Sequence, residues 1–281
     1  MLSATNRNIP IFYRFLAQIR PAGLGAAMKK VFFISRRELT TTSNLRLWID
    51  PVSQFGMTLW RQGAYEPELT KVMEILLRPG DTFIDVGANE GYFSLVASRL
   101  VASGSVEAFE PQQRLQPVIQ RNLELNGAKN VHVHALALSD EEGKEVLYLS
   151  QSTNSGASSF YRKQRFFSAP QTVPTETLSH FFSLRGLGRA RLIKIDCEGA
   201  ETKVVPGMVS LLKEKRFDFI VLEFHPSVIG DKRCEELGRL IKREGYALSR
   251  IGSGQWIFHL PELSNELGSL GPVERVAWGD A

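Results

Sequence analysis

The chain has 281 residues, of which 43% are hydrophobic and 23% charged, and its net charge is +4. These values are typical of soluble globular proteins and exclude global disorder, and the length suits one α/β domain with an extension. The sequence contains no run of about 18 consecutive apolar residues, so no membrane-spanning helix is predicted. Two cysteines, Cys197 and Cys234, are too few for a disulfide framework or a cysteine-based zinc site. Because the N-terminus also lacks a secretory pattern, we expect a cytoplasmic protein.

Residues 1–60 are weakly patterned, and we expect a helical or mixed N-terminal extension. Residues 1–50 contain eight Lys or Arg and two acidic residues, and residues 9–19 place apolar side chains at helical spacing. A basic amphipathic segment of this kind could make a weak peripheral contact with an anionic membrane. The alternatives are a solvated basic face and a helix packed on its own domain.

From residue 82 onward, short apolar runs alternate with segments of helical periodicity. This pattern predicts an α/β fold with a parallel sheet and helices on both faces. The predicted strands are 82–86, 105–109, 131–138, 145–149, 192–195, 217–224, 246–251 and 255–260. The predicted helices are 92–101, 113–126, 200–213 with an interruption near Pro206, and 233–244. The strand at 145–149 is an addition to a seven-strand sheet, which closes with a C-terminal antiparallel hairpin around Gly252 and Gly254.

Between residues 151 and 174 the chain is rich in Ser, Thr, Asn, Gly and aromatic residues. A long irregular stretch inside a compact domain is usually a functional or a disordered loop. We expect a lid over the substrate.

The first predicted strand leads into a glycine loop that opens a helix. Its residues are Gly87, Ala88, Asn89, Glu90 and Gly91. The glycines allow close approach of a ligand, and the free N–H groups at the helix start favour a carboxylate. The G-x-x-x-G spacing differs from that of dinucleotide sites and favours S-adenosylmethionine (SAM), which carries an amino acid tail. Asp85 is expected to accept from the ammonium of that tail, directly or through water. A purely structural strand-to-helix turn is the alternative.

Acidic side chains follow the next two strands. Glu110 ends the second strand, 23 residues beyond Gly87, where an acid accepts both hydrogen bonds of a ribose diol, and Pro111 ends the strand. An N-cap role for Glu110 is the alternative. Ser139 and Asp140 end the third strand and are expected to flank the adenine. The alternative, which has equal weight, is that these residues only form a turn.

Further acids follow the fourth and fifth strands. Asp196 and Glu198 come after residues 192–195, and Glu223 and His225 lie at the end of 217–224. Ligands of open α/β sheets bind at this edge, and methylation of a hydroxyl requires a base or a metal ion that lowers the hydroxyl's pKa. Asp196 is our first choice for the catalytic centre, with the other three as its neighbours. The alternatives are helix caps for Asp196 and Glu198 and a structural role for His225. The spacing alone assigns no metal.

Five ordered motifs carry a specific resemblance: VGANEGYFS, AFEP, ALALSD, IKIDCEGAE and VLEFHP. With the upstream GAYEP at residues 63–67, they resemble the FkbM family of SAM-dependent methyltransferases over residues 63–226. The resemblance implies a class I (Rossmann-like) methyltransferase fold, SAM as cofactor, and transfer to a hydroxyl of a sugar, glycolipid or natural product. It also implies that Tyr65 and Glu66 close over the amino acid end of SAM. The residues that it places beside the acceptor are Asn154, Ser155 and Gly156.

We therefore expect an extension (1–60), a methyltransferase domain (61–262) and a C-terminal tail (263–281). The expected partner is a small-molecule or glycan acceptor, because no aromatic and basic platform for stacking bases is evident, and an oligomer is compatible with the sequence. The alternatives are a nucleic-acid or protein methyltransferase on the same fold, or a silent SAM-binding module. The acids Glu110, Asp196 and Glu223 argue against a silent module.

Overall fold

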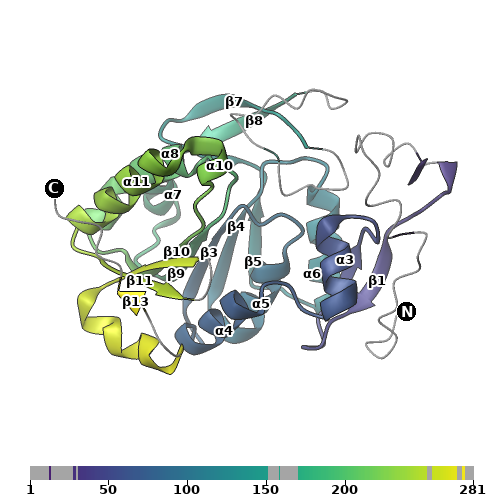
Figure 1. Ribbon diagram of the computed structural model, residues 1–281, viewed down its shortest axis with the longest axis horizontal. Coiled ribbons are helices and arrows are strands. Elements are labelled where there is room, and N and C mark those ends of the chain that lie inside the picture. Colours follow the sequence, from purple (N-terminus) through teal and green to yellow (C-terminus); the bar gives the residue numbers. More distant parts are fainter. Residues whose placement is uncertain are drawn as a thin grey trace.

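The computed structural model describes residues 13, 28–29, 31–150, 158, 170–251, 255–270 and 274–275. A large sheet with the strand order β13-β11-β12-β10-β9-β3-β4-β5 forms its centre (Figure 1). Its parallel strands are β3 (Thr82–Val86), β4 (Ser105–Phe109), β5 (Val131–His134), β9 (Ala190–Ile195) and β10 (Phe217–Leu222). β12 (Gln255–His259) runs antiparallel to both β10 and β11 (Ala247–Ile251), and the two-residue β13 (Glu274–Arg275) extends the edge. Without β13 this is the predicted seven-strand sheet with its C-terminal antiparallel pair, so the fold class is confirmed.

Helices cover both faces of the sheet because successive strand side chains point to opposite sides. On β3, Phe83 belongs to one hydrophobic core and Ile84 to the other, and both are fully buried. The first core packs against α3 (Gln54–Gln62), α4 (Pro67–Leu76), α5 (Tyr92–Val101) and α6 (Gln116–Asn126). The second packs against α7 (Leu178–Arg185), α8 (Glu201–Gly207), α9 (Val209–Lys213) and α11 (Asp231–Arg243). The predicted interruption near Pro206 is confirmed, since it separates α8 from α9.

The described part of the N-terminal extension contributes a hairpin of β1 (Arg37–Thr40) and β2 (Arg46–Ile49). The side chain of Asn122 on α6 accepts from the Trp48 N–H at 2.6 Å, and Leu47 and Ile49 are fully buried in the first core. Apart from Tyr13, residues 9–19 lie outside the described residues. In the part of the chain that is described, no helix combines the length and the apolar character needed to cross a membrane.

The chain forms a second, smaller sheet, which makes two of the sequence predictions wrong. The range 131–138, predicted as one strand, is divided between β5 of the large sheet and β6 (Ala137–Leu138) of the small one. β6 pairs with β8 (Gln171–Glu176), which lies partly in the stretch expected to be irregular, and β8 also pairs with β7 (Gly143–Leu147). Pro174 obscured the strand pattern of β8, because proline usually marks the absence of a paired strand.

Besides α4, three helical elements outside the N-terminal extension were not predicted. Thr177 caps α7 by accepting from the His180 N–H, and Gly186 ends that helix at φ +62, so its start and stop signals are present in the sequence. The other two are the short α10 (Pro226–Ile229) and a 3-10 helix, η2 (Pro261–Leu270).

Candidate active site

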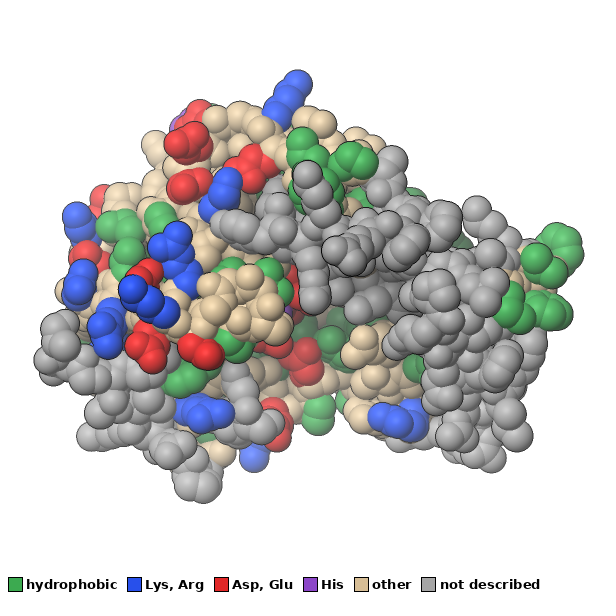
Figure 2. Space-filling model, turned by 45° about the horizontal axis from the view of Figure 1, so that its top comes forward, with side chains coloured by type: hydrophobic (Ala, Val, Ile, Leu, Met, Phe, Trp, Pro, Cys, Tyr) green, Lys and Arg blue, Asp and Glu red, His purple; other side chains and the backbone are tan. Residues whose placement is uncertain are grey.

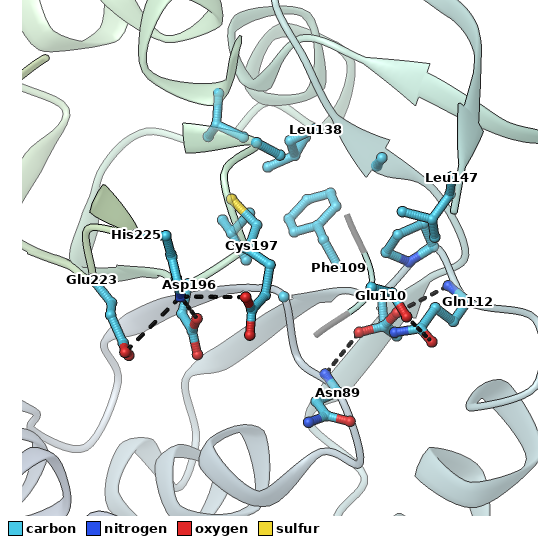
Figure 3. A pocket seen from close by; sticks show the side chains of 18 of the residues that line it. Asn89, Phe109, Glu110, Gln112, Leu138, Leu147, Asp196, Cys197, Glu223 and His225 are labelled. Carbon is cyan, nitrogen blue, oxygen red and sulfur yellow. Dashed lines mark hydrogen bonds and ion pairs between the residues drawn. The ribbon is translucent and has the colours of Figure 1, made fainter. Parts of the chain in front are cut away.

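A cavity of about 430 Å³ opens at the carboxyl edge of the parallel strands, where β3, β4, β9 and β10 end. Its size is within the range of small-molecule sites. Figure 3 shows two polar groups of side chains separated by an apolar floor that includes Phe109 and Leu138. We name them the Glu110 end (Asn89, Glu110 and Gln112) and the His225 end (Asp196, Glu198, Glu223 and His225). Figure 2 shows acidic side chains in the hollow at the centre of the face that it draws.

Backbone N–H groups fix the carboxylate at the Glu110 end. Glu110 is 3% exposed, and its two oxygens accept from the N–H groups of Asn89 and Gln112, each at 2.9 Å (Figure 3). Burial raises the pKa of Glu110 to about 7, although both backbone hydrogen bonds oppose this shift. The Gln112 side chain supplies a third hydrogen bond, and a carboxylate accepts about four, so acceptor capacity remains for a ligand hydroxyl. Pro111 also lines the cavity.

The glycine loop connects the two ends of the cavity. Gly87 adopts φ +79, and a Cβ atom there would lie 1.9 Å from the carbonyl oxygen of Asp196. Glycine at this position is therefore required by the packing between the loop after β3 and the backbone after β9. Asn89 also lines the cavity, with φ +50, whereas Ala88 and Gly91 do not line it.

Tyr65 and Glu66, from the turn before α4, also line the cavity. Glu66 has φ +41, and its side chain accepts from Gln255 Nε2 at 3.3 Å. Burial and the nearby charge of Asp196 raise the pKa of Glu66. Positive φ values of residues other than glycine are costly, and Glu66, Asn89 and Glu198 all combine one with a place in the cavity wall. Such clustering of strained backbone is typical of functional sites.

All four predicted catalytic residues line the cavity at the His225 end. The Nε2 atom of His225 lies 3.6 Å from Asp196, 3.9 Å from Glu198 and 4.0 Å from Glu223. Burial lowers the pKa of His225, but its hydrogen bond to Glu201 and the charges of nearby carboxylates outweigh this and raise the pKa to about 9. Burial and the charges of Asp196 and Glu66 raise the pKa of Glu223 to about 7. The His225 end therefore contains groups that can take up or release a proton.

Asp85 has a different place from the predicted one. It is fully buried and does not line the cavity; it accepts from Ser94 Oγ at 2.7 Å and from Lys194 Nζ at 3.3 Å. The same ammonium lies 3.5 Å from Asp196. Because Asp85 is fully buried and outside the cavity wall, it is not placed for a direct contact with a ligand ammonium, and Lys194 connects it to Asp196. Burial lowers the pKa of Lys194, but the charges of Asp85, Asp196 and Glu66 outweigh this and raise it.

The wall expected to hold the adenine is apolar. Leu136, Ala137 and Leu138 line the cavity, whereas Ser139 and Asp140 do not. The Ser139 N–H instead extends the small sheet by donating to the Glu176 carbonyl, which fixes its backbone away from the cavity. The residues predicted to contact the acceptor (Asn154, Ser155 and Gly156) lie outside the described residues.

The family model for the methyltransferase FkbM domain matches residues 85–248, which are more than half of the chain. The chain belongs to the FkbM methyltransferase family. Methyltransferase 1 of Beauveria bassiana is 30% identical to it over 189 residues, covering 61% of this chain and 75% of that protein. The antimetabolite synthetase AmbE of Pseudomonas aeruginosa is 32% identical over 216 residues, covering 62% of this chain but only 10% of that protein. The solved precorrin-6y C5,15-methyltransferase of Geobacter metallireducens is 13% identical, with a TM-score of 0.42 over 70% of this chain and 90% of that one.

With this family and this sheet, the protein is a SAM-dependent methyltransferase. In the FkbM chain the motif IKIDCEGAE places Lys194 and Asp196 at the end of β9 and Glu201 at the start of α8. The sequence did not reveal three features of this site: which two acids pair with Lys194, the place of Gln112 in the cavity wall, and the role of Glu201. Lys194 and Glu201 belong to the recognised motif, but the motif does not reveal which atoms they contact.

Three side chains at the His225 end have a spacing that could suit a divalent ion. Asp196, Glu223 and His225 bring one ligand atom each within 4.8 Å of one another. The ammonium of Lys194 already supplies a positive charge 3.5 Å from Asp196, which opposes a second cation there. We therefore assign no metal to this FkbM site.

Proposed function

We propose that this enzyme transfers the methyl group of SAM to a hydroxyl of a small-molecule acceptor such as a sugar, a glycolipid or a natural product. The donor's ribose is held by Glu110, its amino acid end lies under Tyr65 and Glu66, and its methyl group points toward Asp196. The supporting observation is that the His225 end consists of three carboxyl groups and an imidazole, which are side chains that can take up a proton. A hydroxyl is a weak nucleophile until its proton leaves, so this chemistry needs such groups where an acceptor can reach them.

Methyl transfer is an in-line displacement, and alignment of the acceptor oxygen with the sulfonium methyl supplies much of the rate. The apolar floor between the two ends excludes water from the path of the methyl group. The relative AmbE is named an antimetabolite synthetase, which is consistent with small-molecule chemistry in a related domain.

The test is transfer of an isotopically labelled methyl group from SAM by the full chain. Parallel reactions contain saccharides and glycolipids, hydroxylated natural products, total RNA, or protein extract. We expect label on an oxygen of a small molecule, and expect its loss with Asp196→Asn. Label that enters RNA or protein instead would overturn the proposed acceptor class, while the enzyme would remain a methyltransferase.

A further inference from the structure

A buried hydrogen bond behind the His225 end joins two residues that are far apart in the sequence. Glu201, at the start of α8, is fully buried, and its Oε1 atom lies 2.9 Å from Nδ1 of His225. The same oxygen accepts from the Cys197 N–H at 3.1 Å. This backbone bond fixes the carboxylate, and the carboxylate in turn fixes the plane of the imidazole.

The pairing determines which nitrogen of His225 carries the proton. A carboxylate only accepts hydrogen bonds, so Nδ1 must carry a hydrogen. In the neutral ring the lone pair is then on Nε2, which faces the cavity and the carboxylates of Asp196, Glu198 and Glu223. Those three acids lie on the side that would receive a proton and do not bond Nδ1. Among the described residues, only Glu201 is placed to set the tautomer.

We propose that Glu201 is a positioning residue that holds His225 with Nε2 free to take the proton of the acceptor hydroxyl. This inference rests on the proposed function. As the acceptor oxygen bonds to the methyl carbon, the carbon–sulfur bond breaks and its electron pair stays on sulfur. The hydroxyl proton moves to Nε2 and later leaves to water. The products are a methyl ether and S-adenosylhomocysteine (SAH), and the transient imidazolium is stabilised by the carboxylates around it.

The charge of the donor supports this order of events. In the donor-free site the surrounding carboxylates favour the imidazolium, whose pKa is about 9. The sulfonium of SAM brings a positive charge to the same end and lowers that pKa, whereas the neutral thioether of SAH does not. Binding of SAM is therefore expected to release the proton from Nε2 and to prepare the base.

The tautomer can be measured without knowing the acceptor. In full-length protein with 15N-labelled histidine, NMR about one pH unit above the pKa of His225 should show a protonated Nδ1 and a bare Nε2. Titration should give a lower His225 pKa in the SAM complex than in the SAH complex. The groups that face this ring during the titration are Asp196 and Glu198 after β9, Glu223 after β10, and Glu201 on α8. A protonated Nε2 in the neutral ring would overturn the proposal.

Two substitutions separate positioning from charge. Glu201→Leu cannot accept a hydrogen bond, so the Nε2–H tautomer should predominate and turnover should fall by about 100-fold or more at unchanged SAM affinity. Glu201→Gln still has an acceptor oxygen but no charge, so it should keep the tautomer, lower the pKa of His225 and reduce turnover by about tenfold. Parental turnover in Glu201→Leu would contradict the proposal.

A matched control exists elsewhere in the sheet. Glu107 on β4 bonds Nε2 of His134 at 2.8 Å, both side chains are nearly buried, and neither lines the cavity. Glu107→Gln should leave the His225 tautomer, SAM affinity and turnover unchanged. If the tautomer is as proposed but no hydroxyl acceptor is ever methylated, the proposed function fails while the assignment of Nδ1 to Glu201 stands.

Discussion

The two ends of the cavity are built in different ways. At the Glu110 end, two backbone N–H groups from neighbouring strand ends hold one carboxylate, so the geometry follows from the sheet itself. At the His225 end, a network of side chains from β9, α8 and the segment after β10 holds the imidazole. The first arrangement suits tight binding of a fixed ligand, and the second suits a proton that must move. Substitutions at the two ends should therefore separate donor affinity from turnover.

The largest effect is expected from Asp196→Asn. This change removes a charge 3.6 Å from His225 Nε2 and 3.5 Å from Lys194. Turnover should fall by about 10²–10³-fold, because the imidazolium that develops at His225 loses a stabilising charge. Calorimetry should show that SAM affinity stays within about threefold of the parent. Parental turnover would place the reacting centre elsewhere.

Gly87 lies in the glycine loop between the two ends and packs against the Asp196 backbone, so its substitution should affect both ends. In Gly87→Ala the new Cβ would meet the Asp196 carbonyl at 1.9 Å, at a φ that only glycine adopts easily. We expect a loss of about 3 kcal/mol in the free energy of unfolding in urea. Gly188→Ala is the control, since no atom lies within 4 Å of its Cβ position, and it should change stability by less than about 0.5 kcal/mol. Equal stabilities of the two variants would refute the close contact.

Glu110→Gln should weaken donor binding and spare the chemical step. The amide would place a donor against a backbone N–H and would lose the charged acceptor of the ribose diol. Loss of a charge-assisted hydrogen bond predicts a 10- to 100-fold rise in the Kd of SAM, with little change in turnover at saturating SAM. An unchanged Kd by calorimetry would contradict the assignment of Glu110 to the ribose.

The smallest effect is a pH dependence of donor affinity. Since burial raises the pKa of Glu110 to about 7, the neutral acid predominates below that pH in the donor-free protein. The ribose diol binds the ionised form, so SAM affinity should fall by about tenfold per pH unit as the pH drops below about 7. Glu110→Gln should remove the part of this dependence that comes from Glu110 and leave the part that comes from proton release at His225. A parental protein with constant affinity between about pH 5.5 and 8 would show that Glu110 is already ionised there.

The contrast between the two ends also explains what the sequence could predict. The glycine loop, Glu110 and Asp196 were found because strand ends meet at one edge of a parallel sheet, which is a property of the backbone. The pairing of Glu201 with His225 and of Asp85 with Lys194 could not be found, because side-chain partners depend on tertiary packing. The small sheet was missed for a related reason, since β6 continues the apolar pattern of β5 while pairing with a distant strand.

We expect one ligand to span both ends of the cavity, with its ribose on Glu110 and its sulfur facing Asp196 and His225. A crystal structure of the protein with SAH tests this most directly. We expect both ribose hydroxyls within hydrogen-bond distance of the Glu110 carboxylate and the sulfur at the His225 end. A bound SAH whose ribose lies away from Glu110, or whose sulfur points away from His225, would contradict it.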